Sequence, residues 1–355
     1  MIEVKNLCKK YGDNLAVDNL SFTVEPGRIY GFLGPNGAGK STTMNIITGC
    51  LAATSGQVLV GGHDIFEEPV QAKKLIGYLP EQPPLYSDMT PREYLRFVAD
   101  AKRVPVGERL NQVENVMNKT GLVDVADRLI RNLSKGYRQR VGIAQAMIGD
   151  PEIIILDEPT VGLDPRQIIE IRDLIASLSE DHTVILSSHI LSEVQAVCDY
   201  AIIISHGRIV ASDTMENLAE GESTHKTMRL IIKASPDVCL DIIDNIEEIS
   251  HYAIVEADEG TNAELTIPVE YDVREPLFNA FSQAGIPILE MEMVRSSLEE
   301  VYLRLTEPEI SDEEVGVSDF SSLVSRLEDE DYEEAEFNDN NDYVSPFTDK
   351  EDDGE

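Results

Sequence analysis

Runs of apolar residues separated by glycine- and proline-containing turns fill the first 220 residues of the chain. Apolar and polar positions alternate from residue 1 to about residue 24, which predicts two or three antiparallel strands. The run at 153–156 is continuously apolar, which is typical of a strand buried on both faces. Apolar residues at helical spacing between about 90 and 131 predict helices. The pattern predicts an α/β domain at 1–220, with an antiparallel β-subdomain and a helical subdomain at about 83–146.

A second pattern follows a short polar linker. From residue 227 to residue 306 the expected elements are strand, helix, strand, strand, helix and strand, with one more helix at 298–305. This order predicts a small α+β domain of the ferredoxin-like kind, closed by that last helix. We see no cluster of catalytic residues in it, so we expect an accessory domain.

Charge is distributed unevenly along the chain. The net charge is −37, and residues 307–355 hold 20 acidic and two basic residues, a net −18 for this segment. Because the segment is acidic and poor in apolar residues, we expect a disordered tail. The negative charge also argues against nucleic acid as a partner. One apolar stripe in the tail suits either a helix that docks on a protein partner or a chance spacing: Phe320, Leu323, Val324 and Leu327.

The sequence also suggests where the protein is located. No window reaches about 18 uninterrupted apolar residues, so we expect no membrane-spanning helix. The N-terminus lacks a charged-then-apolar leader, so a secretory signal is not expected. No pair of cysteines has the CxxC spacing, which favours reduced thiols in a cytoplasmic protein. The four are Cys8, Cys50, Cys198 and Cys239.

One loop matches a phosphate-binding motif. It fits the pattern GxxxxGK[ST], with an apolar run before it and a helix start after it. Glycines allow backbone N–H groups to surround a polyphosphate, and the helix N-terminus adds partial positive charge. Lys40 would reach the β- and γ-phosphates, and the Ser41 hydroxyl would ligate Mg²⁺. The loop consists of Gly34, Pro35, Asn36, Gly37, Ala38, Gly39, Lys40, Ser41 and Thr42.

Two adjacent carboxylates, Asp157 and Glu158, follow the apolar run at 153–156. The carboxyl end of a central strand is where α/β sheets bind ligands. Asp157 would hold Mg²⁺, directly or through water, and Glu158 would act as the general base for an attacking water. A solvated acidic turn is the alternative, although charges that end a buried strand usually have partners.

Four further residues have two interpretations each. Gln82, between a strand and a proline pair, either orients water or Mg²⁺ or is a solvated loop residue. Ser134 caps a helix whose first N–H groups either bind an anion or bind nothing. His189, at a strand end, either donates to a γ-phosphate or packs. Tyr11 either stacks on adenine or is an ordinary strand tyrosine.

Together these segments resemble the ATP-binding subunit of an ABC transporter over residues 1 to about 220. The motifs occur in the order found in that family. They are the phosphate loop at 34–42, Gln82 as the Q-loop, 133–137 as the signature, 153–158 as the Walker B strand, 162–165 with Asp164 as the D-loop, and His189 as the switch histidine, with Tyr11 at the adenine-stacking position.

The resemblance also has one departure. The family's signature is usually LSGGQ, whereas this chain has LSKGY, with Lys135 and Tyr137 substituted. Ser134 and Gly136 remain, and the resemblance implies that they contact the γ-phosphate. It further implies a P-loop NTPase fold, ATP and Mg²⁺ as cofactors, and a pair of copies, or one copy with a homologous ATPase, enclosing ATP.

The resemblance also implies a partner in the membrane. A separate transmembrane permease would hold the protein peripherally on the inner face of the cell membrane. The end of the chain, at 296–305, resembles the drug- and antibiotic-export branch, which favours an exporter. The alternative is a soluble ABC-type ATPase with a non-membrane partner. A single ATPase module and the strong negative charge disfavour this alternative.

Overall fold

A computed structural model describes residues 1–220, 226–246, 249, 252–257, 262–269, 273–295 and 298–306. The expected acidic tail and its docking stripe lie outside the described residues. The chain divides into two compact units. Residues 1–224 and 295–308 form the first unit, and the second takes the remainder of the chain.

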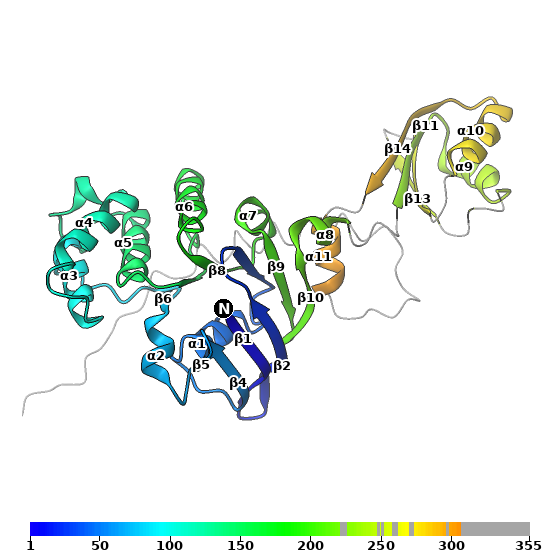
Figure 1. The fold of residues 1–355 in the computed structure, drawn as a ribbon. Coiled ribbons are helices and arrows are strands. Elements are labelled where there is room, and N and C mark those ends of the chain that lie inside the picture. The colour runs from blue at the N-terminus through cyan, green and yellow to red at the C-terminus, as the bar shows by residue number, and fades with distance from the viewer. Residues whose placement is uncertain are drawn as a thin grey trace, which may run out of the picture. The chain divides into compact units, whose positions relative to one another are not determined.

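A six-stranded sheet organises the first unit, in the order β10-β9-β3-β8-β7-β6 (Figure 1). All neighbouring pairs are parallel except β9 and β10. Every residue of β3, β7 and β8 is buried, as the continuous apolar run predicted for β7. Parallel alignment brings the carboxyl ends of these strands to one edge of the sheet. The strands are β3 (Ile29–Leu33), β6 (Ile76–Leu79), β7 (Ile153–Asp157), β8 (Thr183–Ser188), β9 (Tyr200–Ser205) and β10 (Arg208–Thr214).

A second, antiparallel sheet confirms the alternating pattern of the N-terminal residues. Its order is β2-β1-β4-β5, and Ile2 of β1 pairs with Val24 of β2. Apolar residues of this sheet share one core with β3, β7 and the helix α1. This core fixes the phosphate loop, which joins β3 to α1. The elements are β1 (Ile2–Tyr11), β2 (Asn14–Val24), β4 (Ser55–Val60), β5 (His63–Asp64), α1 (Lys40–Ile47) and α2 (Pro69–Lys74).

The predicted helical block is present and lies to one side of the sheet (Figure 1). It contains α3 (Pro91–Ala101), α4 (Arg109–Lys119) and α5 (Lys135–Met147). Thr90 and Glu93 form a reciprocal capping box that starts α3. At the other end of the block, Lys102 Nζ donates to the carbonyls of Gln145, Ala146 and Ile148 at distances of 3.2, 3.2 and 2.6 Å. Lys102 thereby supplies donors to the last turn of α5.

Three more helices complete residues 1–220 of the first unit. They are α6 (Pro165–Leu178), α7 (Leu191–Val197) and α8 (Met215–Glu220). Apolar side chains of α6 and α7 share a core with the helical block and the sheet. None of the described helices is both long and apolar enough to cross a membrane.

The second unit follows the predicted order of elements. Its sheet order is β12-β13-β11-β14, and α9 and α10 contribute apolar side chains to its core. The described elements are β11 (Lys226–Ile232), α9 (Pro236–Ile243), β12 (Ala253–Ala257), β13 (Asn262–Val269), α10 (Arg274–Gln283) and β14 (Ile288–Arg295).

The last helix, α11 (Leu298–Thr306), differs from the expectation. The sequence placed it at the end of the C-terminal domain, but it belongs to the first unit. Leu298 is buried in the large core of that unit, and Tyr302 and Leu305 pack against the same core. Ser205 Oγ of β9 donates to the carbonyl of Thr306 at 3.3 Å. Helical spacing reveals an apolar face but not which surface covers it, so the sequence could not assign α11.

Candidate active site

The phosphate loop is confined on two sides by backbone. A Cβ at Gly34 would lie 2.2 Å from the carbonyl oxygen of Ile204, and a Cβ at Gly39 would lie 2.5 Å from that of Ala16. Gly39 also has φ +104°, a conformation that favours glycine. Gly207 N donates to the carbonyl of Ala38 at 3.0 Å. The glycines of the motif therefore serve the packing of the loop as well as its approach to a ligand.

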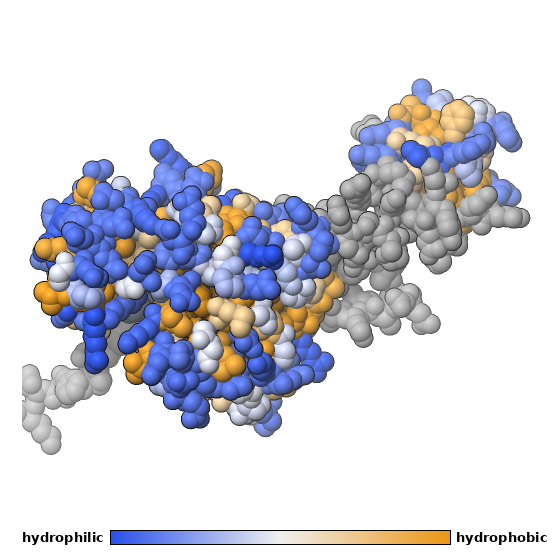
Figure 2. All heavy atoms as spheres, in the orientation of Figure 1, coloured by the Kyte–Doolittle hydropathy of each residue, from blue (hydrophilic) through white to orange (hydrophobic). Residues whose placement is uncertain are grey.

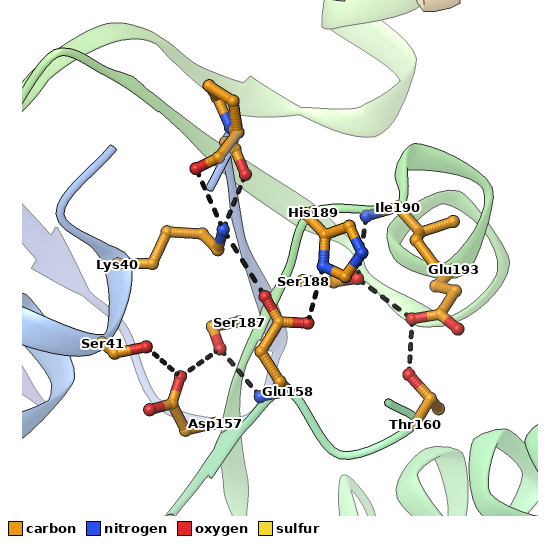
Figure 3. Close-up of polar contacts among 12 residues, drawn as sticks. Lys40, Ser41, Asp157, Glu158, Thr160, Ser187, Ser188, His189, Ile190 and Glu193 are labelled. Carbon is orange, nitrogen blue, oxygen red and sulfur yellow. Dashed lines mark hydrogen bonds and ion pairs between the residues drawn. The ribbon is translucent and has the colours of Figure 1, made fainter. Parts of the chain in front are cut away.

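Lys40 lies within this loop and is only 5% exposed. Its Nζ donates to the carbonyls of Gly34 and Pro35 at 2.7 and 3.2 Å. The same ammonium lies 3.5 Å from Oε1 of Glu158 (Figure 3). Burial lowers the pKa of Lys40, and the negative charge of Glu158 opposes that shift. The ammonium group of Lys40 therefore lies between the phosphate loop and the residue that follows β7.

Asp157 receives two hydroxyl donors. Ser41 Oγ donates to Asp157 Oδ1 at 3.2 Å, and Ser187 Oγ donates to the same oxygen at 2.6 Å. Ser187 Oγ also accepts from Glu158 N at 2.9 Å. Burial raises the pKa of Asp157, and the two hydroxyl bonds oppose the shift. The side chains of Ser41 and Asp157, 116 residues apart in the sequence, thus meet, and both were assigned to Mg²⁺ in the sequence analysis.

These two oxygen ligands fit Mg²⁺. A hydroxyl and a carboxylate are hard donors, and Mg²⁺ usually combines one or two such ligands with water and substrate phosphates. Among the described residues, no group of three or more His, Cys, Asp or Glu side chains could enclose a metal ion. The donor set therefore suits a metal that is shared with phosphates.

Glu158 is held between the side chains of Lys40 and His189. Its Oε1 faces Lys40, and its Oε2 lies 3.0 Å from Nδ1 of His189 (Figure 3). Glu158 is buried and has φ +46°, in the left-handed region that non-glycine residues rarely adopt. Such a conformation persists only where the surroundings fix it, and it often marks a functional site.

Other predicted residues lie in a different place. Ser134 caps α5 by accepting from Tyr137 N, and Asp164 caps α6 by accepting from Gln167 N at 2.9 Å. Together with Gly136 these residues line a cavity of about 440 Å³. The structure thus brings the signature and D-loop residues together, on a surface separate from Lys40.

Two predicted residues are exposed. Gln82 lies in the loop after β6 with an exposed side chain. Tyr11 is 48% exposed at the end of β1, and Lys9 Nζ lies 5.1 Å from its ring centre. Such a face can carry a cation or an aromatic base.

Three residues at the site were missed from the sequence. Ser187, Thr160 and Glu193 are all buried and hydrogen-bonded around Asp157, Glu158 and His189. The adjacent Ser-Ser-His sequence at the end of β8 was the available signal for Ser187. Nothing in the residue type of Glu193 indicates burial, since glutamates are mostly exposed.

Comparison with known proteins identifies the family. The family model described as ABC transporter matches residues 17–161. The bacitracin transport ATP-binding protein BcrA of Bacillus licheniformis is 33% identical over 307 residues, which cover 86% of this chain and 97% of that protein. The chain belongs to the ABC transporter ATP-binding proteins. This ABC protein is therefore an ATP-binding ATPase subunit, as the order of its motifs predicted.

Two more similarities extend the comparison. The linearmycin resistance ATP-binding protein LnrL of Bacillus subtilis is 31% identical over 307 residues, covering 86% of this ABC protein and 98% of LnrL. A dimeric ATP-binding cassette solved in a post-hydrolysis state with ADP and Pi is 26% identical, with a TM-score of 0.55. That match covers 61% of this chain and 99% of the other. The shared fold is therefore that of the ABC ATPase.

Proposed function

We propose that this ABC protein powers the export of an antibiotic through a separate membrane permease. Two of its relatives carry bacitracin transport and linearmycin resistance in their names. The Lys40–Glu158–His189 arrangement carries the proposal, because it places a phosphate-loop cation and a buried carboxylate at one point. The substrate itself would be recognised by the permease.

The hydrolysis site would work mainly by positioning and charge. Backbone N–H groups of the phosphate loop and Lys40 would hold the β- and γ-phosphates. Ser41 and Asp157, with Gln82, would hold Mg²⁺, which neutralises developing phosphate charge. Glu158 would accept a proton from the attacking water, and His189 would orient Glu158 and contact the γ-phosphate. Tyr11 would stack on the adenine ring.

The site would be completed by a second subunit. A separate cavity, whose lining does not include Lys40, is lined by Ser134, Gly136 and Asp164. We infer that this cavity faces the ATP bound by a second copy or by a homologous ATPase. The similarity to a dimeric cassette with ADP and Pi supports this pairing.

The permease would bind the helical block, which places the protein at the inner face of the membrane. Figure 2 shows apolar side chains over this block among polar ones. Tyr86 and Phe97 are 50% and 43% exposed, and their ring centres are 5.2 Å apart. An exposed aromatic pair suits a protein interface. Gln82, four residues before Tyr86, would connect this surface to the nucleotide.

Glu158→Gln tests the function directly. Removal of a general base costs about 10²–10⁴-fold in rate. We expect hydrolysis to fall by that factor, while ATP binding persists and an ATP-bound dimer accumulates in size-exclusion chromatography. Glu152→Gln is the matched control, because Glu152 is exposed just before β7. Hydrolysis by Glu158→Gln at the rate of the control would refute the assignment of the base.

We also propose that the tail docks on a protein partner through its apolar stripe. The stripe's helical spacing supports this proposal. A chain ending at residue 306 should capture less of that partner than the full chain. Substitution of Leu323 and Leu327 by Ser should have the same effect, and equal capture by all three chains would reject the stripe.

A further inference from the structure

A buried carboxylate lies behind the hydrolysis site and has no part in the mechanism above. Glu193 is on the first turn of α7 and is 5% exposed. Its Oε2 accepts from Thr160 Oγ1 at 2.6 Å and from Ser188 Oγ at 3.0 Å (Figure 3). Thr160 and Ser188 are themselves buried. A buried polar group of this kind persists only where hydrogen bonds compensate for lost solvation.

The two donors belong to the two segments that carry the hydrolytic pair. Thr160 lies two residues after Glu158, in the turn that follows β7. Ser188 is the last residue of β8 and directly precedes His189. One oxygen of Glu193 therefore joins the segment of the base to the segment of the histidine.

The same network continues into the backbone beyond His189. Ser188 Oγ accepts from Ile190 N at 3.0 Å, so this hydroxyl links the backbone on the far side of His189 to Glu193. In the turn after β7, the left-handed backbone of Glu158 requires surroundings that fix it. The short bond from Thr160 to Glu193 is one such constraint, two residues further along the chain.

We propose that Glu193 is a positioning residue that sets the separation and orientation of Glu158 and His189. The proposal rests on the function proposed above, in which these two side chains act on the attacking water. Productive geometry tolerates displacements of only about 0.5 Å, so the bond between His189 Nδ1 and Glu158 Oε2 depends on how firmly both segments are held. Glu193 holds both from one point and touches neither the nucleotide loop nor Lys40.

The test compares two substitutions at Glu193. In Glu193→Gln, one amide oxygen can still accept from both hydroxyls, so we expect a kcat close to that of the unmodified protein. Glu193→Leu removes the acceptor at similar volume. We expect its kcat to fall by about 10–100-fold, because a misplacement of about 1 Å that originates far from the chemistry can cost about 10²-fold. The KM for ATP should not change, because Lys40 and its loop are untouched. Gln195→Leu is the matched control, an exposed polar residue on the same helix.

Epistasis separates positioning from a structural role. If Glu193 acts by setting the Glu158–His189 pair, then Glu193→Leu should cause a smaller fold-loss in His189→Ala than in the unmodified protein, whereas independent effects would multiply. Thr160→Val and Ser188→Ala each remove one of the two bonds to Glu193, and Ser188→Ala also removes the acceptor of Ile190 N. Each should lower kcat, and Thr160→Val should lower it less than Glu193→Leu does. These two variants also test the proposal should Glu193→Leu fail to fold.

Three results would overturn the proposal: an unchanged kcat in Glu193→Leu, equal losses in Gln and Leu, or a fall in ATP affinity that matches the fall in kcat. Failure of the proposed function is distinguishable, since it would appear as full activity in Glu158→Gln whatever the behaviour of Glu193.

Discussion

Ser187→Ala removes the side chain that joins both carboxylate residues of the site. Its hydroxyl is fully buried, donates to Asp157 at 2.6 Å and accepts from Glu158 N at 2.9 Å. Loss of a hydrogen bond to a charged group costs about 1.5–3 kcal/mol, and a buried N–H left without an acceptor adds about 1–3 kcal/mol. Allowing for relaxation, we expect a loss of about 2–4 kcal/mol in the stability of the first unit.

The assay is thermal unfolding together with ATP hydrolysis. A unit of this size changes its Tm by about 2–4 °C per kcal/mol, so we expect a Tm lower by about 5–15 °C. Release of the Glu158 backbone should also lower kcat by at least about tenfold, because the base loses its fixed position. Ser192→Ala is the control, since Ser192 is exposed on α7. If both variants unfold at the same temperature with equal kcat, the reasoning about Ser187 is refuted.

Two stability predictions concern other contacts of the first unit. Lys102→Met should lower stability by about 1–2 kcal/mol, because the last carbonyls of α5 lose their donor. Lys119→Met, which breaks an exposed pair with Asp181, should change the unfolding temperature less than Lys102→Met does in the same thermal assay. Leu298→Ala should cost about 2–4 kcal/mol, since Leu298 is buried in the core of the first unit. Val238→Ala, at an exposed site of the second unit, should leave the first unit's unfolding temperature unchanged, and equal effects of the two would contradict the placement of α11.

The sequence was most informative where a pattern of residue types is compatible with few structures. Continuous apolar runs identified the buried strand β7, and the glycine pattern identified a loop that tolerates no Cβ at Gly34 or Gly39. Asp157 and Ser41 were each assigned to Mg²⁺ from the sequence, Ser41 from the phosphate-loop pattern and Asp157 from its place at the end of a buried strand.

The sequence was least informative where burial depends on distant partners. In the sequence Glu193 looks like a surface glutamate, because only the tertiary structure shows its hydrogen bonds from Thr160 and Ser188. The face of α11 was visible as a pattern, but the covering surface on β9 and α8 depends on tertiary structure. The role proposed for Ser134, facing the ATP of a second subunit, involves a partner that no single chain can display.

The return of α11 to the first unit has a mechanical consequence for the phosphate loop. Thr306 is bonded to Ser205, and two residues further on Gly207 is bonded to Ala38 of the phosphate loop. The end of β9 and the turn after it therefore hold both the end of α11 and the phosphate loop. Gly34 of that loop also packs on the carbonyl of Ile204 in the same strand. A displacement of α11 would thus reach the phosphate loop through the end of β9.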